Sequence, residues 1–125
     1  MPLIIPLWLW RSAFTLCLGL VLLLALVPDP DPRLSTGWDK SNHLLAFATL
    51  AFLGCQAVHG RWLSVALGLL AYGVLIEILQ GLTSYRHAEW ADLLADGLGI
   101  LAGLALFGLL RWLQTRYLLK PGDTP

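Results

Sequence analysis

Acidic and histidine side chains occur inside or at the edge of the most apolar stretches of this sequence, where ionisable groups are expensive to place. Asp39 and His43 are one helical turn apart, and Asp92 and Asp96 repeat that spacing later in the chain. Glu77 lies about five residues, roughly 7–8 Å, inside the end of another apolar run. Buried ionisable groups need partners and usually mark sites or pathways, so His43, Glu77 and Asp96 are the strongest functional candidates.

Different kinds of chemistry are open to these side chains. His43 or Glu77 could act as a general base, tuned by burial and by neighbouring charges. Together with Asp92 and Asp96, the same two residues could instead supply the nitrogen and oxygen ligands of a divalent cation such as Mg, Mn or Zn. No nucleophile motif accompanies them. The sequence therefore leaves open whether the protein is an enzyme and whether it holds a metal or cofactor.

Basic and amide side chains flank these acids. Lys40 and Arg86 could hold a phosphate or carboxylate group, but they could also snorkel to the membrane interface. Asp39 and Asp92 could be helix N-caps, and Gln80, one turn after the deep glutamate, could simply hydrogen-bond between helices. Because three separate segments bring polar groups to the same level, we expect them to converge on one cluster.

The composition predicts that membrane helices position these residues. The 125 residues are 58% hydrophobic and 13% charged, with a mean hydropathy of +0.72. A soluble domain of this size could not hide so much apolar surface. A helix needs roughly 20 apolar residues to cross the hydrocarbon, and four stretches qualify: Leu7–Val27, Ser41–Val58, Trp62–Leu82 and Leu93–Leu113. The expected fold is an all-α, four-transmembrane-helix bundle, with residues 1–125 as one domain.

The first apolar run could be mistaken for a secretory signal. It extends upstream of Arg11 and ends in the Pro/Asp run Pro28–Pro32, without a small-x-small cleavage motif. We therefore expect an uncleaved first helix.

The distribution of basic residues predicts the orientation, because cytoplasmic loops collect Lys and Arg. Five of the eight basic residues fall on one side of the four-span arrangement: Arg11, Arg61, Arg111, Arg116 and Lys120. The other three are Arg33, Lys40 and Arg86. We expect a bacterial inner-membrane protein with both termini cytoplasmic. Its acidic residues should lie in the outer half, except Asp123, which follows the last apolar run on the inner side. The basic residues form no stripe interleaved with aromatics, so no nucleic-acid partner is expected, and the oligomeric state is not indicated.

Two glycines continue the face of the aspartates in the fourth run. Gly99 and Gly103 form a small-xxx-small pair, which lets a second helix approach closely. The acids Asp92 and Asp96 should then point into the bundle. Two carboxylates one turn apart repel, so we expect a cation near them, either one of the basic side chains above or a bound metal.

The order and spacing of these residues carry a family resemblance. The motifs are Asp39-Lys40-x-x-His43-x-x-x-Phe47, Glu77-x-x-Gln80, Arg86 six residues before Asp92, and Gly99-x-x-x-Gly103. In this pattern the chain resembles the VanZ-like family of small bacterial membrane proteins over residues 39–103. Asp96 departs from it, since the family usually has asparagine there, and so does Glu89, where a small polar residue or an aspartate is common.

The resemblance implies a role in cell-envelope physiology, because the family is named for a protein associated with teicoplanin resistance. We expect binding or modification of a membrane lipid or lipid-linked envelope intermediate, with glycopeptide tolerance as one outcome. The expected catalytic residues are His43 and Glu77, and the expected ligand-binding residues are Asp39, Lys40, Gln80, Arg86, Asp92 and Asp96. The alternatives are a non-catalytic structural or partner-binding module and a divalent-cation-binding protein. Transport is less favoured, because four short spans without a repeat or a broken helix rarely suffice.

Overall fold

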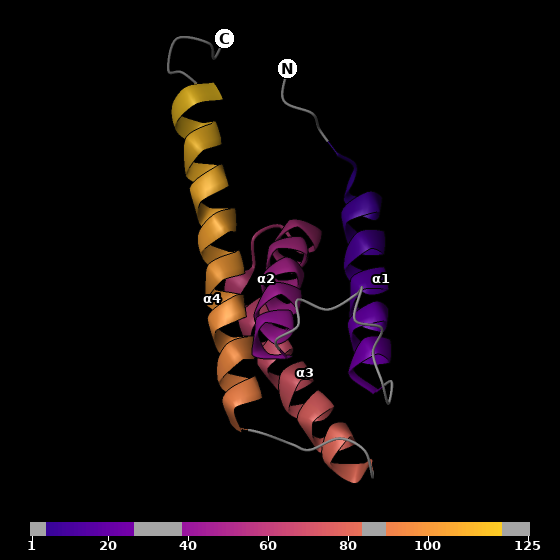
Figure 1. Ribbon diagram of the computed structural model, residues 1–125. Coiled ribbons are helices and arrows are strands. Elements are labelled where there is room, and N and C mark those ends of the chain that lie inside the picture. The colour runs from indigo at the N-terminus through magenta and orange to yellow at the C-terminus, as the bar shows by residue number, and fades with distance from the viewer. Residues whose placement is uncertain (1–4, 27–38, 84–89, 119–125) are drawn as a thin grey trace.

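The computed structural model describes residues 5–26, 39–83 and 90–118, which form long helices and include no strand. The helices are α1 (Leu7–Leu26), α2 (Asp39–Ala57), α3 (Trp62–Leu82) and α4 (Trp90–Leu113), and a π-helical turn, η2 (Gln114–Leu118), extends α4 (Figure 1). The all-α fold class is confirmed.

Two helices begin earlier than the apolar runs predicted. Helix α3 has the expected bounds, but α2 starts at Asp39 rather than Ser41, and α4 starts at Trp90 rather than Leu93. The helical hydrogen bonds include the polar residues that precede each apolar run, whereas a prediction from hydropathy begins only at the first apolar residues. Asp92 therefore lies within the first turn of α4, and its interpretation as an N-cap is wrong.

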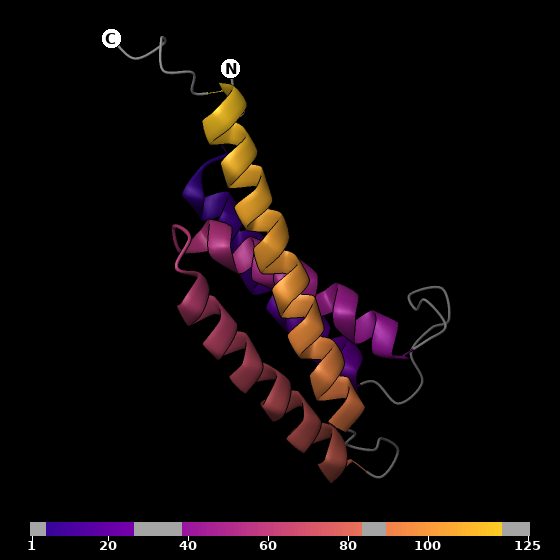
Figure 2. The same cartoon turned by 90° about the vertical axis from the view of Figure 1, so that its left-hand side faces the viewer.

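Helix α2 lies at the centre of the bundle (Figures 1 and 2). It packs most extensively against α4 and also contacts α1 and α3. Its residues Phe47, Leu50, Ala51 and Cys55 are almost completely buried. The rest of the core is contributed by α3 and α4: Val65, Leu69, Ile76, Ile100 and Phe107. By contrast, α1 contributes no fully buried residue and packs on the outside of this core.

Three of the described helices are long and apolar enough to cross a membrane: Leu7–Leu26, Trp62–Leu82 and Trp90–Tyr117. The chain is accordingly a multi-pass membrane protein. Helix α2 falls short of the same criterion because its first turns carry polar residues, from Asp39 to His43. A fourth membrane crossing, by α2, stays a prediction.

The glycines of α4 allow its close approach to α2. A Cβ added at Gly99 would overlap the carbonyl oxygen of Leu44, and one added at Gly103 would overlap that of Ala48. Both neighbours are backbone atoms of α2, so the two helix backbones are in direct contact along this face. This confirms the packing role predicted from the Gly99/Gly103 spacing.

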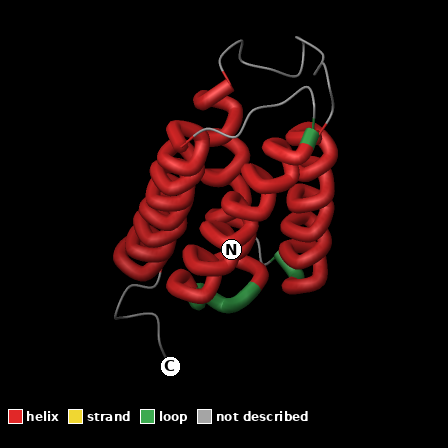
Figure 3. The backbone as a smooth tube through the Cα atoms, turned by 90° about the horizontal axis from the view of Figure 1, so that it is seen from below, coloured by secondary structure: helices red, strands yellow, loops and turns green. Residues whose placement is uncertain are grey.

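Successive helices run in opposite directions, which brings four helix ends together. In Figure 1 the end of α1, the start of α2, the end of α3 and the start of α4 are the lower ends of their helices, and the start of α2 lies higher in the view than the other three. Figure 3 views the bundle from below this end. Every described residue of the predicted polar cluster belongs to one of these helix ends, and the arrangement gathers them in three dimensions.

Candidate functional site

The imidazole of His43, on α2, lies between two aspartates of α4. Its Nδ1 is 2.8 Å from Asp96 Oδ1, and its Nε2 is 3.8 Å from Asp92 Oδ2. The side chains of His43, Asp92 and Asp96 are only 10%, 4% and 1% exposed. The ring therefore links two buried carboxylates that are one helical turn apart.

The imidazole of His43 is the group that lies between the two aspartates. An ionised carboxylate can only accept hydrogen bonds, so a His43 N–H donates to Asp96 Oδ1 across the 2.8 Å contact. A protonated imidazole would present N–H groups to both acids and carry a compensating positive charge. We expected a basic side chain or a metal at this position, and the structure places histidine there.

A third acid, Glu77, approaches the same ring from α3. One carboxylate oxygen of Glu77, one of Asp96 and one ring nitrogen of His43 all lie within 4.8 Å of one another. Glu77 is 5% exposed, so it is buried beside polar groups rather than turned toward acyl chains. The three helices α2, α3 and α4 thus each contribute one potential ligand to one point.

Gln80 extends the polar surface by one turn of α3 and ties it to α1. Its Nε2 donates to the carbonyl oxygen of Ala25 at 2.9 Å, which is the hydrogen bond between helices considered as the structural alternative. A ligand-binding role for Gln80 stays a prediction. The side chain is 2% exposed, and its Oε1 accepts no hydrogen bond from any residue in the described part of the chain.

Gly73, which the sequence pattern did not single out, makes room for Asp96. A Cβ at this position would lie 2.8 Å from Asp96 Oδ2 and 3.5 Å from the ring of Phe47. Any larger residue would therefore push the carboxylate away from its present place. The available signal was the spacing from Gly73 to Glu77, which puts both on one face of α3.

The remaining predicted residues are placed only in part. Asp39 and Lys40 occupy the first turn of α2, one turn before His43, but their side chains lie outside what the structure describes. The segment 84–89, which contains Arg86, is also outside the described residues. Their roles as ligand-binding residues stay predictions.

Comparison with known proteins assigns the chain to a family. Residues 18–111 match the VanZ/LLP1 family model, a span that contains all of α2 and α3 and every residue of the cluster. No curated protein and no solved structure gives a match. The matched span is well over half of the 125 residues and agrees with the resemblance read from the motifs. The chain belongs to the VanZ/LLP1 family.

Proposed function

We propose that this protein acts in the bacterial cell envelope, at the outer face of the inner membrane, by binding a phosphorylated lipid or lipid-linked intermediate through a divalent cation. The observation that carries the proposal is the convergence of His43, Glu77 and Asp96 from three different helices. The three side chains are largely buried, and His43 contacts Asp96 directly.

The donor atoms suit a divalent cation. Carboxylate oxygens are the preferred ligands of Mg²⁺ and Mn²⁺, and an imidazole nitrogen is also accepted by Mn²⁺ and Zn²⁺. Metal–ligand bonds of about 2.0–2.6 Å place ligands on opposite sides of an ion about 4–5 Å apart. The 4.8 Å limit on the His43, Glu77 and Asp96 atoms is within that range.

Charge explains why a cation fits between this cluster and a phosphate. The described part of the cluster has three carboxylates, on Glu77, Asp92 and Asp96, around one imidazole. An anionic headgroup would be repelled by ionised acids in a poorly hydrated place. A divalent ion would neutralise the acids and keep coordination positions for the phosphate, while Lys40 and Arg86 would bind its other oxygens.

Catalysis by His43 is a second candidate, favoured by its contact with Asp96. A carboxylate bound to one imidazole nitrogen orients the ring and leaves the other nitrogen to take a proton. Here the other nitrogen, Nε2, lies 3.8 Å from a second acid, Asp92 Oδ2. Binding is therefore the function proposed, and the catalytic roles of His43 and Glu77 stay predictions.

The cation site can be tested with Mn²⁺ alone. The purified chain in detergent micelles should bind one Mn²⁺, measured by calorimetry or by electron paramagnetic resonance. Glu77→Gln should weaken that affinity by at least about tenfold, the lower end of what even outer-shell changes cause. Affinity should also fall as the pH is lowered, because protons compete for the imidazole and the carboxylates.

Asp123→Asn is the matched control, because it removes an acid that the sequence places at the opposite end of the bundle. It should bind Mn²⁺ like the wild type. Equal affinities for Glu77→Gln and the wild type would contradict a metal site at this cluster.

The proposed orientation predicts which engineered thiols can be labelled in intact cells. A cysteine at Ser84 should react with a membrane-impermeant reagent added from outside. One at Thr115, which is exposed beyond the last turn of α4, should react only after permeabilisation. The native thiols of Cys17 and Cys55 lie among apolar side chains and should give little background. The reverse labelling pattern would move the polar cluster to the cytoplasmic side.

A further inference from the structure

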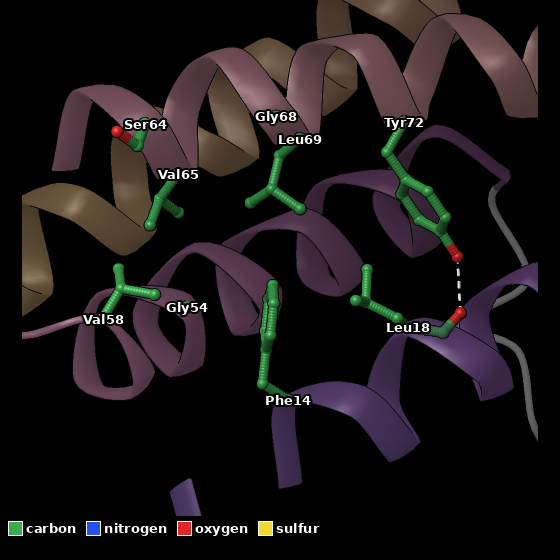
Figure 4. Close-up of a pocket in the computed structure, with 9 residues that line it drawn as sticks. All are labelled: Phe14, Leu18, Gly54, Val58, Ser64, Val65, Gly68, Leu69 and Tyr72. Atoms are coloured by element: carbon green, nitrogen blue, oxygen red, sulfur yellow. Dashed lines mark hydrogen bonds between the residues drawn. The ribbon is translucent and has the colours of Figure 1, made fainter. Parts of the chain in front are cut away.

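A second feature lies away from the polar cluster. A partly open cavity of about 320 Å³ is enclosed by α1, α2 and α3 (Figure 4). Its lining is almost wholly apolar and includes Phe14 and Leu18 of α1, Val58 in the turn after α2, and Leu69 of α3. Tyr72 borders one end, where its hydroxyl donates to the carbonyl oxygen of Leu18 at 2.5 Å.

The cavity exists because α1 stands away from α3. Gly54 of α2 packs tightly, since a Cβ there would lie 2.9 Å from Val65 and 3.2 Å from the Phe14 ring. At Gly68, on the cavity wall, an added Cβ would meet nothing within 4 Å. An apolar space of this kind excludes water but accepts apolar molecules. Within a bilayer, the apolar molecules available to fill it are the acyl chains of lipids.

Two exposed cations, Arg11 and Arg61, lie near the other end of the cavity. Arg11 is one turn before Phe14 on α1, and its Nε donates to the carbonyl oxygen of Ala57 at 3.1 Å. Arg61 directly precedes α3 and is one turn before Ser64, which lines the cavity at this end. A ligand that matches both features has a hydrocarbon chain and an anionic head.

We propose that this cavity holds an acyl chain of an anionic glycerophospholipid, with its phosphate against Arg11 and Arg61. The lipid belongs to the leaflet at the basic end of the bundle, opposite the polar cluster. From Ser64 to Tyr72 the cavity follows α3 for eight helical steps of 1.5 Å, about 12 Å. Basic sites between membrane helices are known to recognise anionic headgroups in this way.

Photo-crosslinking in nanodiscs tests the proposal on the full chain. The probe is phosphatidylglycerol with a diazirine midway along one acyl chain, at trace level in phosphatidylcholine, and adducts are mapped on peptides. We expect adducts to concentrate on residues 14–18 and 64–72. Phosphatidylcholine carrying the same diazirine chain should label these segments much less.

Substitutions test the binding of the acyl chain and the binding of the headgroup separately. Gly68→Phe should fill the cavity and abolish labelling of the two segments, and the smaller Gly68→Leu should reduce it if the phenylalanine variant does not fold. Arg11→Gln and Arg61→Gln should each lower the preference for phosphatidylglycerol by about fivefold.

Two control variants carry similar substitutions away from the cavity. Gly108→Phe adds the same ring to α4, where an added Cβ also meets nothing within 4 Å. Arg116→Gln removes a cation at the same end, whose guanidinium lies over the Trp112 ring instead. Both should label like the wild type. Adducts spread evenly over the exposed faces, equal labelling by the two probes, or full labelling of the Gly68 variants would each overturn the proposal.

Discussion

Alanine at Gly103 should destabilise the bundle by about 3 kcal/mol or more, at the upper end of overpacking effects. The added methyl would overlap the Ala48 carbonyl oxygen and lie 2.7 Å from the Ala51 Cβ, both on α2. A backbone oxygen cannot rotate away as a flexible side chain can, so α2 and α4 must separate. Their contact is the most extensive in the molecule. Unfolding in mixed micelles measures the change in free energy.

Gly108→Ala is the matched control in the same helix. Its Cβ meets no atom within 4 Å, and alanine favours a helix by up to about 1 kcal/mol over glycine. This variant should be as stable as the wild type or more stable. If Gly103→Ala were equally stable, the close contact between α2 and α4 would be wrong.

Gly103→Ala should also weaken the contacts within the polar cluster. Asp92 and Asp96 are carried by α4, whereas His43 is carried by α2, so separating the helices stretches the contacts between them. Gly103→Ala protein that still folds should therefore bind Mn²⁺ more weakly than Gly108→Ala protein. Packing at Gly103 and chemistry at the cluster are linked through the rigidity of one helix.

The sequence predicted the helices well because a helix that crosses a membrane needs a long apolar run, which hydropathy detects. It placed α3 at its observed bounds and recognised the close face of α4 from the Gly99/Gly103 spacing. It did not predict that α2 would be central. Which helix occupies the middle depends on how all four pack together, and α2 is the least apolar of them because its first turns carry the site.

The site was predicted as a set of residues but not as a geometry. His43, Glu77 and Asp96 were identified because each is an ionisable group in an apolar run. Their mutual contacts join residues up to 53 positions apart, and no local spacing encodes such a distance. Gly73 was missed for the same reason, since its importance comes from Asp96 on another helix.

Asp96→Leu should abolish function, whereas Asp96→Asn should retain at least part of it. Asp96 Oδ1 accepts a hydrogen bond from His43 Nδ1, and Oδ2 fits against Gly73. Asparagine has nearly the same shape, keeps an acceptor and a possible metal ligand, and restores the residue common in the family pattern. Leucine has no acceptor, and its branched end would crowd Gly73 and Phe47.

The size of the leucine effect follows from what it leaves behind. His43 would lose the acceptor for a largely buried N–H group, which destabilises by about 1–3 kcal/mol. Leucine is also easier to insert into a membrane than aspartate, so the protein should still accumulate. Loss of function would then come from the site rather than from failed biogenesis.

Both variants should be compared for membrane accumulation, Mn²⁺ affinity and sensitivity to glycopeptide or lipid-targeting antibiotics. We expect Asp96→Asn to bind Mn²⁺ with reduced affinity, because one negative charge is lost from the cluster, and Asp96→Leu to bind none. Complementation should follow the same order. If leucine matched the wild type in accumulation, ion binding and antibiotic response, Asp96 would be a passive residue. The site would then have to be built from α2 and α3 without the acids of α4.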